Sequence, residues 1–363
     1  MYICKILYFL TTTPYPMPNL SEVRYRKNVF CKVKNLTKLS EVLTLPPQYI
    51  RQLAEIPEYN VFTVPKKNGE RRLIENPSKS LKAVQAVLND YLQAIYWLQK
   101  TPSAYGFVIR PMDAREEPRN IVTNARQHLN KAWLLNADLE DFFHFVKDDV
   151  VMQVFMEKPF NFPLDIADLL TRLMTLNGRL PMGAPTSPVL SNLAFQRVET
   201  EIQAYAHQYG WHFTRYADDM SFSSDVPITL HQIDALENIV KLYGYEFNPN
   251  KVMLYGPDDE KSVTGLRLDN KEGRVELPHA FPHDFQRETK RLNDILTVQG
   301  HLHHKDSAWV TQYKQQIGGK LQFAEQVLGN QHPDYIILEK MYEIALEPPD
   351  EYESISWLNF TYF

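Results

Sequence analysis

The stretch Tyr216-Ala217-Asp218-Asp219 decides the fold of this chain. It lies between His212-Phe213-Thr214-Arg215 and Met220-Ser221-Phe222-Ser223, two runs in which apolar and polar side chains alternate. Such alternation is typical of half-buried β-strands, and two such runs joined by a short link predict a β-hairpin. The hairpin turn then carries two adjacent carboxylates, which are the hard oxygen ligands that Mg²⁺ prefers.

A third carboxylate, Asp138, ends the apolar run Trp133-Leu134-Leu135-Asn136-Ala137, which predicts a buried strand. Burying an unpaired carboxylate costs several kcal/mol, so Asp138 must be protonated, paired with a cation or bound to metal. Beside the hairpin acids it would complete a two-metal site. The other acidic pairs, Asp148-Asp149 and Asp258-Asp259, are expected to be ordinary helix-start and turn residues.

The composition of the 363 residues, with 44% hydrophobic and 12% aromatic side chains, excludes a disordered protein. The two cysteines, Cys4 and Cys31, have neither metal-ligand nor disulfide spacing, which favours a cytoplasmic location. The apolar run at residues 6–10 is too short to span a membrane, so no membrane partner is expected, and Met17 is an alternative start to Met1. Although the net charge is −5, the chain has basic runs at 24–38 and 66–72. These runs suggest a surface that binds along the phosphates of a nucleic acid.

Together with the segment Leu180-Pro181-Met182-Gly183-Ala184-Pro185-Thr186-Ser187-Pro188, these motifs make the chain resemble the reverse transcriptases. Tyr216-Ala217-Asp218-Asp219 matches the signature hairpin of that family, and Asp138 matches its first catalytic strand. The resemblance runs in the expected order from about residue 61 to about residue 270. It implies an α+β right-hand polymerase with fingers, a palm whose antiparallel sheet is backed by helices, and an α-helical thumb.

Within that family the chain is most similar to bacterial retron reverse transcriptases. Asn124-Ala125-Arg126-Gln127-His128 fits the retron pattern of Asn-Ala, two variable residues and His, and Val263-Thr264-Gly265 fits a second retron marker. The resemblance implies RNA-binding roles for Asn124, His128, Val263, Thr264 and Gly265. The alternatives are a helix-end histidine at His128 and a strand bulge at Gly265.

The resemblance also implies roles for other residues. Two Mg²⁺ ions would bind the catalytic residues Asp138, Asp218 and Asp219, and Lys251 would protonate the leaving pyrophosphate, unless it is only a strand-edge lysine. The residues expected to bind the incoming deoxynucleotide are Lys66, Arg72, Phe143, Met182 and Gly183. Lys66 and Arg72 belong to a basic hairpin tip, whose alternative role is solubility.

Two of these positions concern nucleotide selection. Phe143 would lie under the sugar of the incoming nucleotide and exclude a 2′-hydroxyl; the alternative is an aromatic residue of the palm core. If the strand continues through these residues, Phe142 should point to the opposite face from Phe143. Met182 stands where the family usually has glutamine, and a thioether cannot donate the corresponding hydrogen bond, so nucleotide selectivity is in question.

The predicted domain organisation combines this resemblance with the hydrophobic pattern. The boundaries are an N-terminal extension with a basic run (1–35), fingers (36–135 with 151–180), a catalytic palm (136–278), a helical thumb (279–345) and an acidic tail (346–363). The predicted elements are a hairpin at 61–74, strands near 251–254 and 263–268, and helices at 81–98, after Pro185, and at 230–243, 284–298, 308–328 and 335–345.

By this resemblance, the protein is an RNA-directed DNA polymerase of an anti-phage retron. It would copy a cognate structured non-coding RNA into RNA-linked single-stranded DNA (msDNA), primed from a 2′-hydroxyl. Its partners would be that RNA, the cDNA product, dNTPs and a separate effector protein. The alternatives are a non-retron defence-associated reverse transcriptase, a group II intron-like reverse transcriptase and a non-catalytic RNA chaperone, the last being disfavoured by the intact Asp138, Asp218 and Asp219.

Overall fold

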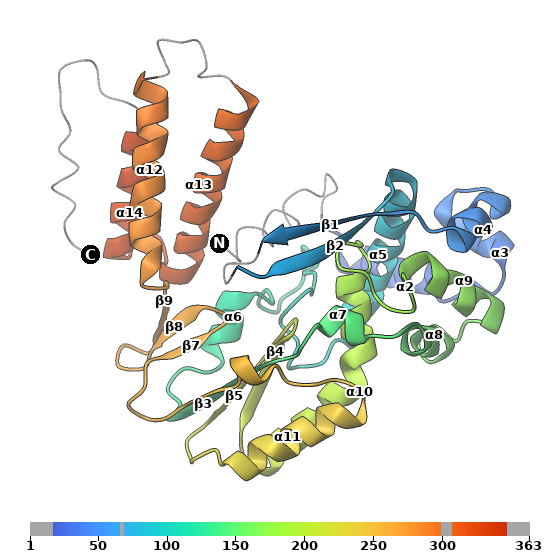
Figure 1. The fold of residues 1–363 in the computed structure, drawn as a ribbon, viewed down its shortest axis with the longest axis horizontal. Helices are drawn as coiled ribbons and strands as arrows, with labels where there is room; N and C mark the ends of the chain where they lie inside the picture. The colour runs from blue at the N-terminus through green and yellow to red at the C-terminus, as the bar shows by residue number, and fades with distance from the viewer. Residues whose placement is uncertain (1–16, 66–68, 299–306, 347–363) are drawn as a thin grey trace. The chain divides into compact units, whose positions relative to one another are not determined.

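The computed structural model describes residues 17–65, 69–298 and 307–346. These residues fall into two compact units, one that spans Met17–Asp259 and one that begins at Glu260. The elements of both units are labelled in Figure 1. None of the helices within the described ranges combines the length and apolar character needed to cross a lipid bilayer.

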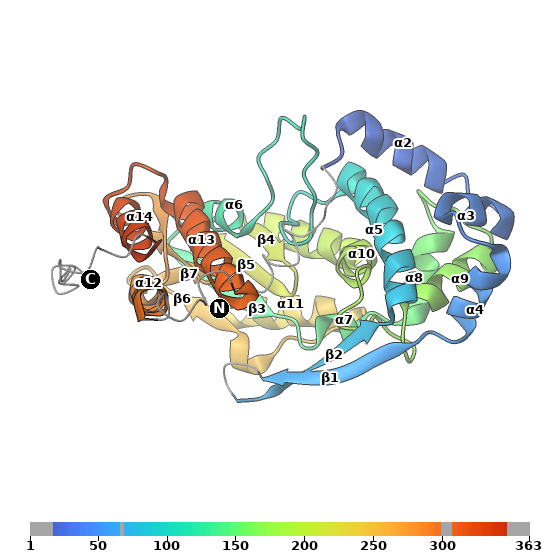
Figure 2. The same ribbon diagram turned by 90° about the horizontal axis from the view of Figure 1, so that it is seen from above.

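The first unit begins with three helices, which precede a long two-stranded hairpin. The helices are α2 (Leu20–Phe30), α3 (Leu36–Leu43) and α4 (Pro47–Glu55), and the antiparallel hairpin consists of β1 (Tyr59–Pro65) and β2 (Arg71–Pro77). Helix α5 (Lys79–Gln99) follows, with Ser78 as its N-cap, and α2 packs against it (Figure 2). The predicted hairpin at 61–74 and helix at 81–98 are confirmed, whereas Lys66 lies outside the described residues.

A four-stranded antiparallel sheet forms the centre of this unit. Its strands are β3 (Trp133–Asp138), β4 (His212–Tyr216), β5 (Asp219–Ser224) and β6 (Met253–Tyr255), in the order β4-β5-β3-β6. The predicted strand at 133–138 and the predicted hairpin around Tyr216-Ala217-Asp218-Asp219 are therefore confirmed.

The two faces of this sheet differ because side chains alternate along each strand. Leu135, Phe213 and Phe222 share the apolar face and belong to one core with residues of α10 (Ser187–Gln208) and α11 (Leu230–Leu242). The opposite face carries small polar residues: the Ser221 hydroxyl donates a hydrogen bond to the Asn136 side chain at 2.9 Å. The predicted antiparallel sheet backed by helices is confirmed, and Figure 1 shows α10 and α11 beside it.

Shorter elements connect these parts. They are α6 (Ile121–Arg126), α7 (Phe142–Phe145), α8 (Asp148–Met156), α9 (Leu164–Met174) and the 3-10 turn η1 (Pro249–Lys251). Asp148-Asp149 opens α8, as expected of helix-start acids. The strand does not continue through Phe142, because Asp141 has φ 37° and starts α7. Strand alternation therefore does not govern where Phe142 and Phe143 point.

The second unit contains a small sheet and three helices. The antiparallel strands are β7 (Lys261–Val263), β8 (Leu266–Asp269) and β9 (Arg274–Glu276), and the helices are α12 (Ala280–Val298), α13 (Ala308–Leu328) and α14 (Pro333–Leu346). The helices pack through buried side chains that include Leu292, Ile317 and Leu338. The three helices agree with prediction, and β9 was not predicted. Residues 1–16 and the tail at 347–363 lie outside the described residues.

Candidate active site

Three carboxylates lie at one end of the sheet. The turn between β4 and β5 carries two of them, and the end of β3 carries the third. Asp138 and Asp219 are direct cross-strand partners on the polar face. Ala217, at φ 60°, provides the left-handed residue that the turn requires, and the Asp218 carbonyl accepts a hydrogen bond from the Leu139 N–H at 3.1 Å. The sequence therefore placed Asp138, Asp218 and Asp219 together correctly.

Their proximity changes the protonation of these acids. Removal from water, and then the Asp138 carboxylate, raise the pKa of Asp218 to about 6. Removal from water and the carboxylates of Asp218 and Asp138 raise the pKa of Asp219 well above its ordinary value. Solvent still reaches the Asp219 side chain. The two neighbouring carboxylates therefore contribute more than burial to its raised pKa.

Two cations face this cluster. Lys251 Nζ lies 2.8 Å from Asp138 Oδ1, which gives the nearly buried Asp138 the partner that its position demands. Burial lowers the pKa of Lys251, but the hydrogen bond to Asp138 and the three carboxylate charges outweigh it, so its pKa is raised. The charges of Lys251 and Arg72 also act on Asp218 and lower its pKa. The structure therefore brings Lys251 and Arg72 near the carboxylates, and their predicted roles stay predictions.

The donor set suits a hard divalent cation, since it consists of carboxylate oxygens whose mutual repulsion a cation would relieve. In the arrangement described, Lys251 contacts Asp138, and Asp138 and Asp219 are hydrogen-bonded to each other. Across residues 17–65, 69–298 and 307–346, no three His, Cys, Asp or Glu side chains are gathered as ligands of one ion. A cation that bound Asp138 would therefore compete with Lys251.

The segment with Met182 and Gly183 docks onto strand β2. The Glu75 N–H donates to the Met182 carbonyl at 2.7 Å, and the Met182 N–H donates to Glu75 Oε2 at 3.2 Å. Gly183 has φ 134°, and a Cβ there would lie 2.9 Å from the Glu75 carbonyl oxygen. Only glycine satisfies both constraints, so Gly183 is required by this close approach.

Sequence reasoning missed the ion pair that holds this docking in place. Arg179 Nη1 and Nη2 donate to the two carboxylate oxygens of Glu75 at 2.8 and 2.9 Å. Glu75 is 2% exposed, and despite burial, which raises its pKa, the Arg179 and Met182 hydrogen bonds lower it overall. An acid in a solvent-facing hairpin reads as a surface residue, and only its partner 104 positions away explains its burial.

Phe143 lies on α7, close to the carboxylates in sequence and half-buried in the structure. Its ring centroid lies 6.0 Å from that of Phe107 and 5.9 Å from that of the buried Phe142. The side chain is therefore only partly covered, although it also packs against the core. Its contact with a nucleotide sugar stays a prediction.

Asn124 and His128 are inside the protein. Asn124 is 1% exposed and His128 is 0% exposed. The His128 ring bridges the strands of the catalytic hairpin, with Nε2 2.6 Å from Thr214 Oγ1 and Nδ1 2.8 Å from Ser223 Oγ. Burial, and then His212, lower the pKa of His128 to about 3, so the ring is neutral. Their RNA-binding role stays a prediction, and as placed here it would be indirect.

Val263, Thr264 and Gly265 lie in the second unit. Val263 ends β7 and is buried, whereas Thr264 (φ 49°) and Gly265 (φ 82°) form the two-residue turn into β8. Two left-handed residues in succession make a tight hairpin turn, so Gly265 is a turn residue and not a bulge. Its exposed position is compatible with the predicted RNA contact, which stays a prediction.

Residues 64–268 match the family model "Reverse transcriptase (RNA-dependent DNA polymerase)". This chain belongs to the reverse transcriptase family, with the right-hand polymerase fold and RNA-directed DNA polymerase activity of that family. The predicted fold and enzyme class are thereby confirmed.

Retron reverse transcriptases are among its relatives. It is 30% identical to the retron Ec86 reverse transcriptase of Escherichia coli over 318 residues, which cover 82% of this chain and 95% of that one. It is 30% identical over 275 residues to the retron Mx65 reverse transcriptase of Myxococcus xanthus, covering 69% of this chain and 61% of that one. The predicted retron-like reverse transcriptase is confirmed. A telomerase structure from Candida albicans aligns with TM-score 0.47 and 9% identity, covering 81% of this chain and 64% of that one.

Proposed function

We propose that this chain copies a cognate structured non-coding RNA into single-stranded DNA that stays joined to the RNA. Synthesis starts from a 2′-hydroxyl of that RNA, within a cytoplasmic anti-phage retron that includes a separate effector protein. The observation that carries the proposal is the match to the Ec86 enzyme across 95% of its length. The clustering of Asp138, Asp218 and Asp219 supports the catalytic part of it.

The chemistry follows from the carboxylate cluster. Two Mg²⁺ ions held by Asp138, Asp218 and Asp219 would activate the attacking hydroxyl and stabilise the leaving pyrophosphate. The β4–β5 turn presents Asp218 and Asp219, and the β3 terminus presents Asp138 on the same face. The raised pKa of Lys251 keeps a proton on Nζ, from which it can pass to the departing pyrophosphate.

The residues around this cluster would bind the deoxynucleotide. Arg72, with Lys66, would contact the triphosphate, and the Met182-Gly183 backbone would line the pocket where β2 fixes it. Phe143 would exclude the 2′-hydroxyl by its volume. The Met182 thioether contributes shape and no donated hydrogen bond.

We assign the fingers to residues 36–135 and 151–180, the palm to 136–278 and the thumb to 279–345. The hairpin β1–β2 in the first of these ranges, the catalytic sheet in the second and helices α12–α14 in the third support the assignment. The compact-unit boundary after Asp259 falls within the assigned palm, and β7–β9 group with the helices that follow.

The test is to identify what the full-length protein holds in its native host. Extracts are prepared at mild ionic strength, because phosphate contacts weaken as salt rises. The expected result is one abundant small RNA joined to single-stranded DNA, which RNase reduces to DNA with a short branched remnant. An Asp218→Asn variant should retain the RNA and lack the DNA.

Other products would contradict the proposal. Recovery of unbranched DNA would favour a non-retron defence-associated reverse transcriptase. Recovery of a spliced intron RNA would favour a group II intron-like enzyme, and the absence of a specific RNA would exclude a cognate partner.

A further inference from the structure

A fully buried ion pair lies behind the catalytic hairpin. Arg215 is on β4 and points to the apolar face, opposite to the face of Asp138 and Asp219. Its Nη2 donates to Glu199 Oε2 on α10 at 2.9 Å, and both side chains are 0% exposed. Burial lowers the pKa of Arg215, but Glu199 outweighs it and the pKa is raised, so the guanidinium is charged.

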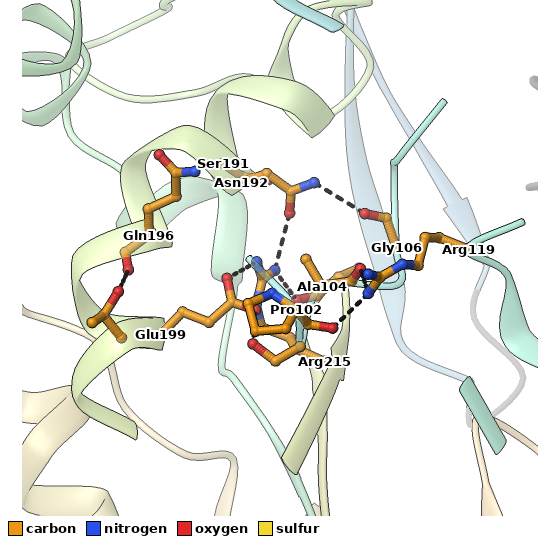
Figure 3. Close-up of polar contacts among 12 residues, drawn as sticks. Pro102, Ala104, Gly106, Arg119, Ser191, Asn192, Gln196, Glu199 and Arg215 are labelled. Atoms are coloured by element: carbon orange, nitrogen blue, oxygen red, sulfur yellow. Dashed lines mark hydrogen bonds and ion pairs between the residues drawn. The ribbon is translucent and has the colours of Figure 1, made fainter. Parts of the chain in front are cut away.

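The same guanidinium reaches the catalytic turn. Arg215 Nη1 donates to the Ala217 carbonyl at 2.9 Å and to Asn192 Oδ1 at 3.1 Å. The Asn192 side chain also donates from Nδ2 to the Gly106 carbonyl at 3.0 Å, so that Asn192 lies between Gly106 and Arg215 (Figure 3). Ala217 is the left-handed residue directly before Asp218. The donor to its carbonyl therefore acts on the bend that presents both carboxylates.

The segment 103–106 packs against the same turn. Arg215 N–H donates to the Ser103 carbonyl, and Tyr105 N–H donates to the Arg215 carbonyl, both at 2.8 Å. A Cβ placed on Gly106 would lie 2.4 Å from the Ala217 nitrogen. The Arg119 guanidinium secures this segment by donating to the Ala104 carbonyl at 3.1 Å (Figure 3).

Stability alone does not account for this arrangement. A buried ion pair gains little or nothing over well-packed apolar residues of similar volume, because desolvating both charges offsets their attraction. What apolar residues cannot supply is a planar fork that binds a carboxylate, an amide and a backbone carbonyl at fixed angles. The Arg215 guanidinium donates to the Ala217 carbonyl, which directly precedes Asp218 and Asp219.

We propose that Arg215 is a positioning residue for polymerisation: held by Glu199 and Asn192, it fixes the Ala217 carbonyl and so sets the catalytic turn that carries Asp218 and Asp219. The proposal rests on the polymerase activity of the family and not on the proposed retron RNA. Loss of Arg215 should therefore slow the chemical step without weakening nucleotide binding.

The test uses the double variant Arg215→Met/Glu199→Leu in the full chain, which removes both charges and leaves apolar side chains. Single-turnover dNTP addition is measured on an RNA template with an annealed DNA primer. The melting temperature should fall, because Ser103, Asn192 and Ala217 lose buried hydrogen-bond partners, so the rates are measured well below it. The maximal rate should fall on the order of 10²-fold, and half-saturation by dNTP should not change. Arg215→Lys with Glu199 intact should recover only part of the rate, because an ammonium cannot reproduce the fork.

The matched control is Arg197→Met/Glu157→Leu, an exposed ion pair between Arg197 on α10 and Glu157 at the end of α8, with N and O 2.6 Å apart. It should leave rate and melting temperature unchanged. A folded Arg215→Met/Glu199→Leu protein with the parental rate would overturn the proposal, as would a fall in rate that comes only with a matching loss of dNTP binding.

A second variant keeps the proposal testable if the double variant does not fold. Asn192→Leu retains the buried ion pair but removes the amide between Arg215 and Gly106. Its maximal rate should fall about 10-fold with dNTP half-saturation unchanged. A parental rate in a folded Asn192→Leu protein would equally overturn the proposal.

Discussion

The two faces of the four-stranded sheet carry ion pairs of the same chemical kind in opposite environments. On the polar face, Lys251 pairs with Asp138 while its side chain stays 54% exposed. On the apolar face, Arg215 pairs with Glu199 and both are 0% exposed. An exposed ammonium can exchange partners and give up a proton, whereas a buried guanidinium does neither. The comparison supports the proposal that the Lys251–Asp138 pair (the front pair, on the polar face) takes part in chemistry and that the Arg215–Glu199 pair (the back pair, on the apolar face) holds the geometry of the site.

The largest expected effect concerns the front face alone. Asp218→Asn should lower DNA synthesis by at least about 10³-fold, because it removes a carboxylate that the reaction needs at the turn. The fold should not weaken, since removal from water, and then the Asp138 carboxylate, already raise the pKa of Asp218 and disfavour its charge. Primer extension and thermal unfolding measure the two quantities.

Asp225→Asn is the matched control, because Asp225 follows the far end of β5 and pairs with Lys131 at an exposed site. It should leave synthesis unchanged. Normal synthesis by the Asp218→Asn protein would remove the front face from the mechanism.

The second effect sharpens the role of the front pair. Lys251→Met should reduce the rate of nucleotide addition about 10²-fold, as expected for loss of a general acid. Single-turnover kinetics should show the loss in the maximal rate, with a slower rate from Lys251→Arg than from the parent. Lys241→Met, which breaks an exposed pair with Glu237 on α11, is the control and should have no effect. A Lys251→Met enzyme as fast as the control would reduce Lys251 to a structural partner of Asp138.

The third effect tests selection beside the carboxylates. Phe143→Ala should raise ribonucleotide incorporation relative to deoxynucleotide incorporation about 10-fold, because a smaller side chain leaves space for the 2′-hydroxyl. Phe145→Ala removes a similarly half-buried ring from the same helix and should leave the ratio unchanged. Equal ratios in both variants and the parent would place Phe143 in the palm core.

The sequence predicted the front face far better than the back face. Alternating strands and acidic residues at a turn are local patterns, and they located Asp138, Asp218 and Asp219 correctly. The pairing of Arg215 with Glu199 depends on how β4 packs against α10, which no local pattern reveals. One local signal could have revealed it. Arg215 lies two residues after the buried Phe213 on the same strand, so both side chains point to the same face and the charge points inward.

The retron marker at 124–128 shows a related limit. The retron resemblance implies that His128 binds RNA, and the alternative is a helix-end histidine. The structure instead places His128 across the two strands of the hairpin, where Thr214 and Ser223 satisfy both ring nitrogens. Burial of a polar residue is set by the partners that tertiary packing brings to it, and the motif itself contains neither of these hydroxyl residues.

The smallest expected effect concerns His128, and it is a change in the free energy of unfolding. His128→Leu leaves the hydroxyls of Thr214 and Ser223 without the ring, which should cost about 2 kcal/mol of unfolding free energy at pH 8. Because the pKa of His128 is about 3 in the folded protein, an unfolded chain takes up a proton there below about pH 6.5 and the folded one does not.

The stability that neutral His128 provides is thus present above pH 6.5 and declines as the pH falls towards 3. At about 1.4 kcal/mol per pH unit, the stabilities of parent and His128→Leu should converge near about pH 5. His212, whose ring packs 5.5 Å from His128, titrates in both proteins and cancels in the comparison. Urea midpoints from pH 8 to pH 4.5 measure the difference. A difference that does not change with pH would mean that His128 is not buried as a neutral ring, and that the polar face is more open to solvent than the structure shows.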